Sequence, residues 1–487
     1  IAACGPPRRS ISGIRHLRMS GRRPRCERPA TRFAAARKIG FIYIHTNCTA
    51  SGPDSRAHPG RTSRGTTRCS EAHDGYGDSS DRPDLAVGRS RRQQQENSIR
   101  RWQMERSTVG MRCKPLITVA LAAAAFAAAS TAMADQVVKI GSVEPTTGGI
   151  SHLGKDNENG ARLAVEEINA KGLTIGGKKV TLQLDAQDDA ADPRQATQVA
   201  QKLVDDKVVA VIGHLNSGTS IPASKIYSDA GIVQISPSAT NPTYTQQGFK
   251  TTYRVVATDA QQGPALASYA QAKGVKSVAV IDDSTAYGQG LANEFEKKAK
   301  ALGLKVLSHD ATNDKAVDFR AILTKVKGEN PDAIMYGGMD ATGGPLAKQA
   351  KQLGLRAKIL SGDGVCTDSL AELAGPAADN VLCSQAGAAL EKMPGGADFL
   401  AKYQKRFNQG IKFDAPFAYD AVYIAVDAMK RANSTDPAKI LAAMPSTKYE
   451  GVIGTTTFDS KGDLTHGIIS IYGYKSGKKT FLDQVKM

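Results

Sequence analysis

Residues 135–487 contain no tryptophan, only two cysteines and no apolar run long enough to cross a bilayer. They also lack the phosphate-binding loop, the nucleophile elbow, the HExxH zinc motif and the CxxC redox motif. Their 40 basic and 38 acidic side chains nearly cancel, which removes the charge argument for binding nucleic acid. This near-neutral part is long enough for a large core and for more than one folding unit.

Residues 1–110 are a different kind of chain. They hold 21 Arg and one Lys against 9 acidic residues, and so carry most of the net charge of +17. They show no sustained period of helix or strand, so we expect an Arg-rich leader that is disordered. Our interpretation is that a wrong start site was translated and that Met111 is the true start. The alternative is a genuine disordered tail, and in that case a basic arm that binds nucleic acid would again be a hypothesis.

Residues 111–134 have the features of a secretory signal peptide. Arg112 and Lys114 form a short positive region, and an apolar run of 14 residues follows at 116–129. Small residues at 132 and 134 then give a cleavage site after Ala134. The run is too short for a transmembrane anchor, so we expect residues 135–487 to be an exported, soluble protein.

Cys366 and Cys383 are the two cysteines of the exported part. An exported chain meets an oxidising compartment, where an even number of cysteines favours disulfide formation. We therefore expect one disulfide, and the alternative is a pair of buried free thiols.

Short apolar strands alternate with amphipathic helices throughout the exported part. A strand is predicted at 137–143, a helix at 159–172 ended by Gly172, and a further helix after the N-cap Asp192. Such βα units form parallel sheets with helices on both faces, and ligands bind beyond the carboxyl ends of the strands. The rhythm repeats over about 135–256 and 259–385, which indicates two lobes.

Three loops at predicted strand ends carry groups that suit a ligand. Ser217 stands where a helix begins, which suits a carboxylate, although a plain N-cap is the alternative. Ser238 and Thr240 offer a carbonyl, an N–H and hydroxyl oxygens after another strand. Asp363 lies between two glycines and is the candidate partner for a cation. One anion holder, one cation holder and no catalytic group indicate a receptor for a zwitterion.

We identify no catalytic, metal or cofactor site. The exported part has four isolated histidines, which we interpret as polar neighbours rather than ligands, and no nucleophile–base pair is visible. An acidic cluster has a superficial likeness to a metal site, but we expect Asp192 to be an N-cap and the others to end a solvated strand. Its members are Asp185, Asp188, Asp189 and Asp192.

The loops above, taken with four further motifs, resemble those of the periplasmic leucine/isoleucine/valine-binding proteins, the type I solute-binding proteins of ABC importers. The motifs are GSVEPTTGG (141–149), NGARLAVEEINAKG (159–172), DDAADPRQA (188–196) and AYGQGLA (286–292). The resemblance covers essentially all of 135–487. It implies two Rossmann-like lobes joined by three crossovers, the first at about 135–256 plus 388–453 and the second at about 259–385 plus 454–487.

The resemblance also assigns roles to residues. Ser217 would hold the α-carboxylate of an amino acid, Ser238 and Thr240 the α-ammonium, and Asp363 would stand at the family's acidic ammonium partner, usually Glu. Tyr287 would be the aromatic that the second lobe brings on closure. The walls of the side-chain pocket would include Phe417, Leu215 and Asn216.

Some residues depart from the family pattern. Leu153 and Met339 stand where the best-known members carry tyrosines, so the side-chain pocket is expected to be reshaped. Ala191 and Asn216 occupy the positions of the usual first-lobe disulfide. Both cysteines of that bridge are missing together, so a Cys366–Cys383 bridge would be a different one, in the second lobe.

The function that this implies is a periplasmic receptor that captures an amino acid, most simply a branched-chain one, and delivers it to an inner-membrane ABC permease. We expect a monomer without cofactor or metal that binds no nucleic acid and is not an enzyme. One alternative keeps the fold and binds an amide, urea or an aromatic acid, which Leu153, Met339 and Asp363 leave open. The other is a ligand-sensing regulator, against which the signal peptide argues.

The signal peptide yields the first prediction. The secreted protein should begin at Asp135 and should show tyrosine emission alone, because Trp102 is the only tryptophan of the chain. N-terminal sequencing of the native protein, together with its fluorescence spectrum, measures both. An N-terminus upstream of Met111 would refute the wrong-start interpretation.

Overall fold

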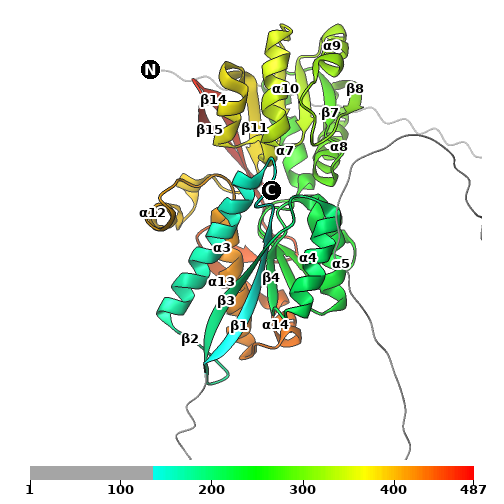
Figure 1. Ribbon diagram of the computed structural model, residues 1–487. Helices are drawn as coiled ribbons and strands as arrows, with labels where there is room; N and C mark the ends of the chain where they lie inside the picture. Colours follow the sequence, from blue (N-terminus) through cyan, green and yellow to red (C-terminus); the bar gives the residue numbers. More distant parts are fainter. Residues whose placement is uncertain (1–134) are drawn as a thin grey trace, which may run out of the picture. The chain divides into compact units, whose positions relative to one another are not determined.

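The structure is a computed structural model that describes residues 135–487, so the leader and the signal segment lie outside the described residues. Within that range the chain forms two large sheets with helices on both faces (Figure 1). We call the six-stranded sheet with its helices the first lobe, and the seven-stranded sheet with its helices the second lobe. This is the predicted α/β fold with two lobes. No helix in the described range is long and apolar enough to cross a membrane.

The first-lobe sheet has the order β2-β3-β1-β4-β5-β6 and is parallel except for the β2–β3 pair. Its strands are β1 (Gln136–Glu144), β2 (Leu173–Ile175), β3 (Lys178–Asp188), β4 (Ala210–Gly213), β5 (Val233–Ser236) and β6 (Thr252–Arg254). A parallel sheet needs helical crossovers, and these cover both of its faces. In Figure 1, α3 (Ser151–Lys171) and α13 (Ala415–Ala432) lie on one side, and α4 (Pro193–Asp205) and α5 (Ser217–Asp229) on the other.

The second-lobe sheet has the order β15-β14-β11-β10-β9-β7-β8, with two antiparallel strands at one edge. Its strands are β7 (Ser277–Asp282), β8 (Lys305–Ala311), β9 (Ala333–Gly337), β10 (Lys358–Ser361), β11 (Val381–Gln385), β14 (Ile468–Lys475) and β15 (Lys478–Lys486). The remaining helices are α6 (Thr243–Gln246), α7 (Asp259–Ala272), α8 (Ala286–Ala301), α9 (Arg320–Glu329), α10 (Asp340–Gln352), α11 (Asp368–Ala374), α12 (Gly396–Phe407) and α14 (Pro437–Ala443).

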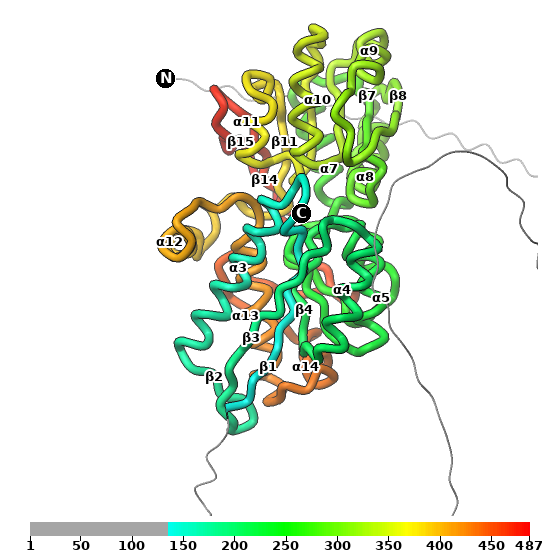
Figure 2. The backbone as a smooth tube through the Cα atoms, viewed as in Figure 1, coloured from blue at the N-terminus to red at the C-terminus, as the bar shows by residue number. Residues whose placement is uncertain are grey.

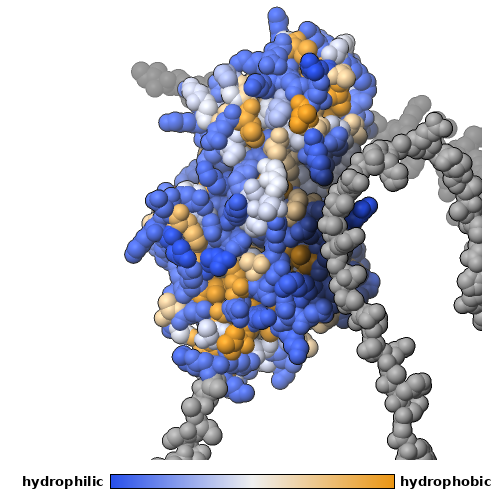
Figure 3. All heavy atoms as spheres, in the orientation of Figure 1, coloured by the Kyte–Doolittle hydropathy of each residue, from blue (hydrophilic) through white to orange (hydrophobic). Residues whose placement is uncertain are grey.

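The period of two along the central strands explains why both faces of each sheet are buried. In β1, Ile140 packs into the cluster that includes α3 and α13, whereas Val143 packs into the cluster formed with α4 and α5. The second lobe repeats this arrangement in β7, where Val280 and Ile281 belong to opposite clusters. The outer surface is mainly hydrophilic on the face drawn in Figure 3, with smaller apolar patches between the polar side chains.

The first helix begins earlier than predicted. The sequence indicated a helix over 159–172, but α3 starts at Ser151, so the helix has extra turns that include Gly154, while Gly160 lies within the predicted range. A side chain at Gly154 would meet the carbonyl oxygen of Pro145, and one at Gly160 would meet that of Ala415. Close backbone packing therefore requires glycines that weaken the helical pattern. The predicted end is correct, because Gly172 terminates the helix with a positive φ of 77°.

Asp192 is the N-cap of α4, as predicted. Its carboxylate accepts hydrogen bonds from the backbone N–H groups of Arg194 (2.8 Å) and Gln195 (3.0 Å), and Pro193 opens the helix. The N–H donors lower the pKa of this exposed carboxyl group. Asp192 therefore has a structural role that needs no metal ion.

The chain passes between the two lobes three times, after β6, after β11 and after β13 (Gly454–Thr457), as the tube in Figure 2 allows the reader to follow. The strand β13 pairs with β12 (Lys448–Gly451) in a separate two-stranded sheet. The predicted boundary at residue 453 thus falls between two paired strands.

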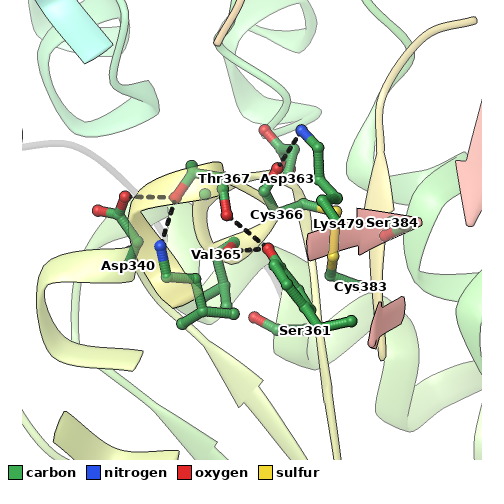
Figure 4. The surroundings of a disulfide bond; sticks show 12 residues. Asp340, Ser361, Asp363, Val365, Cys366, Thr367, Cys383, Ser384 and Lys479 are labelled. Atoms are coloured by element: carbon green, nitrogen blue, oxygen red, sulfur yellow. Dashed lines mark hydrogen bonds between the residues drawn. A yellow bond between two sulfur atoms is a disulfide. The ribbon is translucent and has the colours of Figure 1, made fainter. Parts of the chain in front are cut away.

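Cys366 and Cys383 form a disulfide in the structure, with their Cα atoms 5.3 Å apart (Figure 4). The bond ties the loop after β10 to β11, the neighbouring strand of the sheet. Both cysteines are buried. The loop fixed in this way also contains Asp363.

The disulfide yields the second prediction. Replacing both cysteines with alanine should cost about 3 kcal/mol of unfolding free energy, because a 17-residue separation is no longer closed in the unfolded chain. Thermal denaturation measures the loss of stability, and alkylation of the periplasmic protein without reductant tests whether the bridge is present. Two alkylatable thiols in the native protein would contradict it.

Candidate functional site

The candidate residues lie where parallel strands end, as the sequence predicted. Ser217 follows β4, Ser238 and Thr240 follow β5, and Asp363 follows β10. Tyr287 lies in the first turn of α8, just after β7. The carboxyl ends of strands in both lobes therefore supply this set of side chains.

Asp363 is held by side chains from two helices of the second lobe. The side-chain amide of Gln262 donates to Oδ1 of Asp363 at 2.6 Å, and the hydroxyl of Tyr287 donates to the same oxygen at 3.0 Å. The Tyr287 oxygen accepts in turn from the N–H of Gly364 at 3.0 Å. Burial raises the pKa of Asp363 to about 6. A residue that only capped a turn would not need these partners, so the carboxylate is positioned.

The disulfide region supports the same carboxylate indirectly. Ser384, next to Cys383, donates from its hydroxyl to the side-chain oxygen of Gln262 at 3.0 Å. That bond orients the amide so that its N–H group points to Asp363. Figure 4 shows Asp363 and Ser384 on either side of the bridge.

Asp259 is a second buried carboxylate that the sequence analysis missed. It is the first residue of α7 and has no exposed surface. No side chain in the described range meets hydrogen-bond geometry at either carboxylate oxygen, although the Thr240 hydroxyl and the Gln262 amide lie near enough to lower the pKa of Asp259 in part. Burial, followed by the charge of Asp363, raises the pKa of Asp259 to about 8. An unpartnered buried carboxylate is costly, which points to a cation that completes the site.

Thr240 lies beside this second carboxylate. Its carbonyl accepts the backbone N–H of Asp259 at 2.8 Å, and its hydroxyl is buried without a partner in the described range. Ser238 is also buried, and its hydroxyl accepts from the side-chain amide of Asn157 at 2.9 Å. The hydroxyl of Thr240 and the two aspartates form a set of oxygen atoms that suits an ammonium group.

A fully buried arginine holds the loop that carries Thr240. The guanidinium of Arg254 donates to the carbonyls of Ala239 (2.5 Å) and Asn241 (3.1 Å), the residues on either side of Thr240. It also pairs with Asp463 at 2.6 Å. Arg254 is therefore a positioning residue, and nothing in its sequence context singled it out.

Ser217 is not the N-cap of its helix. The N-cap of α5 is Asn216, whose side chain makes no capping bond and whose buried oxygen has no partner in the described range. Ser217 is the first helical residue, and its hydroxyl oxygen accepts the N–H of Asn241 at 3.1 Å. Its hydroxyl hydrogen and the N-terminus of this 13-residue helix remain suited to an anion.

The two residues at the expected tyrosine positions, Leu153 and Met339, belong to one apolar cluster that spans the lobes. Leu153 and Leu215 form a small buried cluster with Ile150, and Met339 of the second lobe packs against it. Phe417 belongs elsewhere, since its ring lies against Gly387 and lines a separate cavity of about 250 Å³.

A larger cavity of about 640 Å³ opens between loops of the two lobes. Of the predicted residues, Asn216, Tyr287 and Met339 line it, and so does Ala191 at the position of the absent cysteine. Ser217, Thr240 and Asp363 are not among its lining residues and are almost fully buried. The polar anchors are thus shielded from solvent, and the wider space is lined largely by small and apolar residues.

These features define a two-lobed solute-binding protein. A profile of the periplasmic binding protein family matches residues 137–478, and the chain belongs to this family. Membership makes the chain a substrate-binding protein of ABC importers, which act in the periplasm and interact with a membrane permease.

Three proteins illustrate the relationship. The Leu/Ile/Val-binding protein homolog 1 of Brucella suis is 37% identical over 355 residues, which cover 72% of this chain and 93% of that protein. The leucine-binding protein LivK of Thermotoga maritima has a TM-score of 0.67 at 30% identity, covering 72% of this chain and 98% of that one. LivJ of Streptococcus pneumoniae, solved with isoleucine, has a TM-score of 0.66 at 27% identity, covering 72% and 100%.

The raised pKa of Asp259 yields the third prediction. Without ligand, Asp259 keeps its proton between about pH 4 and 8 while the unfolded chain releases it, so this group makes the native state less stable as pH rises through that window. Asp259→Asn removes that loss. Its melting temperature should therefore exceed that of the wild type by a few degrees at pH 8 and match it near pH 4.

Asp192→Asn is the matched control, since the pKa of Asp192 is lowered and not raised. That variant should gain no stability at high pH. Thermal melts of the ligand-free proteins from pH 4 to 8 make the comparison. A pH-independent difference between Asp259→Asn and the wild type would show that Asp259 is not a buried, uncompensated acid.

Proposed function

We propose that this chain captures a branched-chain amino acid between its lobes and delivers it to an inner-membrane ABC permease. The observation that carries the proposal is the pairing of two buried carboxylates, Asp363 and Asp259, with hydroxyl and helix N-terminal groups on the opposite lobe. The names of the Brucella suis and Thermotoga maritima relatives support the same ligand class.

In this proposal the ligand α-ammonium lies between Asp363, Asp259 and Thr240. Desolvation raises the pKa of both carboxyl groups in the absence of ligand. A bound cation compensates for the lost water and favours their ionised form. The carbonyl of Ser238 is the fourth oxygen that we assign to this group. Each hydrogen bond to the ammonium is charge-assisted and is therefore stronger than a neutral one.

The ligand α-carboxylate binds Ser217 and the N-terminus of α5, with the N–H of Thr240 beside it. Backbone N–H groups at a helix start attract an anion through the helix dipole. The aliphatic side chain contacts Leu153, Leu215 and Met339, which already pack together. Asn216 lies at the strand end beside this pocket, whereas Phe417, expected from the resemblance to wall it, lines a separate cavity and is not part of the proposed site.

Tyr287 connects binding with closure. It belongs to the second lobe and holds Asp363, so it reaches the ligand only when the lobes approach each other. In the proposed binding mode the ligand contacts residues of both lobes and therefore favours the closed state. In this function the protein is an exported monomer cleaved after Ala134, binds no nucleic acid and catalyses no reaction.

Acids that lack an amine are disfavoured by the same geometry. An aromatic carboxylate would leave Asp259 and Asp363 buried without a counter-charge, and a neutral amide or urea would compensate them only in part. Leu153 and Met339 in place of tyrosines alter which ligand side chain fits the pocket, but they do not alter the residues assigned to the ligand ammonium.

The fourth prediction tests this function. Calorimetry should detect binding of leucine, isoleucine or valine and none of benzoate or urea. Asp363→Asn should weaken amino-acid binding by about 10- to 150-fold, because one hydrogen bond to a charged group is lost or weakened.

Asp420→Asn is the control variant. Asp420 is a buried acid with a pKa raised to about 7, it accepts the N–H groups of Val452 and Ile453 between β12 and β13, and it is not among the residues assigned to the ligand. Its loss should leave affinity within twofold. An Asp363→Asn affinity within twofold of the wild type, or binding of benzoate in place of amino acids, would overturn the proposed function.

A further inference from the structure

The helix N-termini of α3 and α10 meet across the cleft between the lobes. Gly149, which precedes α3, faces Ala341 of α10, with 3.7 Å between the Ala341 methyl and the position of a Cβ at Gly149. One turn further on, Leu153 and Met339 share an apolar cluster. Between these two contacts, Nε2 of His152 lies 2.7 Å from Oδ2 of Asp340.

Asp340 is a carboxylate fixed on the second lobe. Its side chain is fully buried, and the hydroxyl of Thr367 donates to the same Oδ2 at 2.6 Å. Thr367 follows Cys366, so the disulfide holds this partner in place, as Figure 4 shows. The other oxygen, Oδ1, has no partner among the described residues. The remaining support is the N-terminus of α10, where Asp340 is the first residue.

His152 is the only one of these partners that belongs to the first lobe. Its side chain is 28% exposed, so it reaches from the rim of the cleft to a buried acceptor. When the lobes separate, His152 leaves with α3, whereas Thr367 stays with Asp340. The bond therefore contributes to the free energy of the closed state alone, and water replaces it in the open state.

We propose that His152 and Asp340 form a latch across the cleft that slows release of the bound ligand. The latch rests on the proposed function, because it acts on the same lobe closure. It lies next to Leu153 and Met339, so a polar bond and an apolar contact together join the lobes at this point. His152 and Asp340 are positioning residues that touch each other and need not touch the ligand.

The chain offers a matched control histidine. His309 also bonds an aspartate, with Nε2 2.9 Å from Oδ2 of Asp282, and its Nδ1 lies 2.6 Å from Oε2 of Glu296 in the same lobe; its side chain is 26% exposed. His309 and Asp282 lie on β8 and β7, neighbouring strands of the second lobe. Loss of this bond can affect the stability of that lobe, but it cannot affect closure directly.

The fifth prediction is a comparison of ligand release. His152→Ala should speed dissociation of leucine by about tenfold or more, as for loss of a hydrogen bond to a charged group. The ligand-free melting temperature should stay unchanged. His152→Gln, which keeps an N–H donor at a similar reach, should restore part of the wild-type rate. His309→Ala should release leucine within twofold of the wild-type rate. Stopped-flow dissociation of the full exported chain measures all four proteins.

A second measurement separates the latch from the identity of the ligand. Small-angle scattering of the ligand-free proteins should show a more open average for His152→Ala than for the wild type or His309→Ala. If no amino acid binds and this difference is present, the proposed function fails and the latch stands. Equal dissociation rates for His152→Ala and His309→Ala, or equal scattering of the wild type and His152→Ala, would overturn the latch.

Discussion

Burial of carboxylates without a protein cation is the constraint on which the cleft depends. Neither Asp259 nor Asp363 has a Lys or Arg within ion-pair distance in the described part of the chain, and both are almost inaccessible to water. The nearest guanidinium, on Arg254, uses its donors on Asp463 and on the carbonyls around Thr240. The described residues therefore supply no counter-charge for these two acids. In the proposed function the ligand ammonium supplies it, and a neutral solute would not.

The positions of these acids follow from different levels of structure, which decides what the sequence could predict. Loops at the ends of parallel strands are visible as small and hydroxyl residues after an apolar run, so Ser217, Thr240 and Asp363 could be placed near one edge. Asp259 could not, because it opens a helix after a crossover. Its approach to Asp363 depends on how α7 packs against the second sheet. The local sequence pattern indicates where strands end, whereas contacts between distant helices depend on tertiary packing.

The same distinction explains the early part of α3. Gly154 weakens the helical signal there, and a glycine is required because a side chain would meet the backbone of Pro145. Missing this turn left His152 and Leu153 without a helix in the sequence analysis. The resemblance placed Leu153 at the pocket. That its neighbour His152 faces Asp340 of the second lobe follows only from the start of α3 at Ser151.

Division of the polar groups between the lobes makes binding and closure one equilibrium. Ser217 and Thr240 are on the first lobe, and Asp363 and Tyr287 are on the second. In the proposed binding mode, the first lobe alone would leave the ligand ammonium without Asp363 and Asp259, and the second lobe alone would leave the ligand carboxylate hydrated, so a ligand held by one lobe is bound weakly. The full set of charge-assisted bonds forms only on closure, and the ligand's differential affinity for the closed state is then the free energy that brings the lobes together. Contacts between the lobes that do not involve the ligand add to that difference without changing which solute is chosen, so retention and selectivity can be adjusted by different residues.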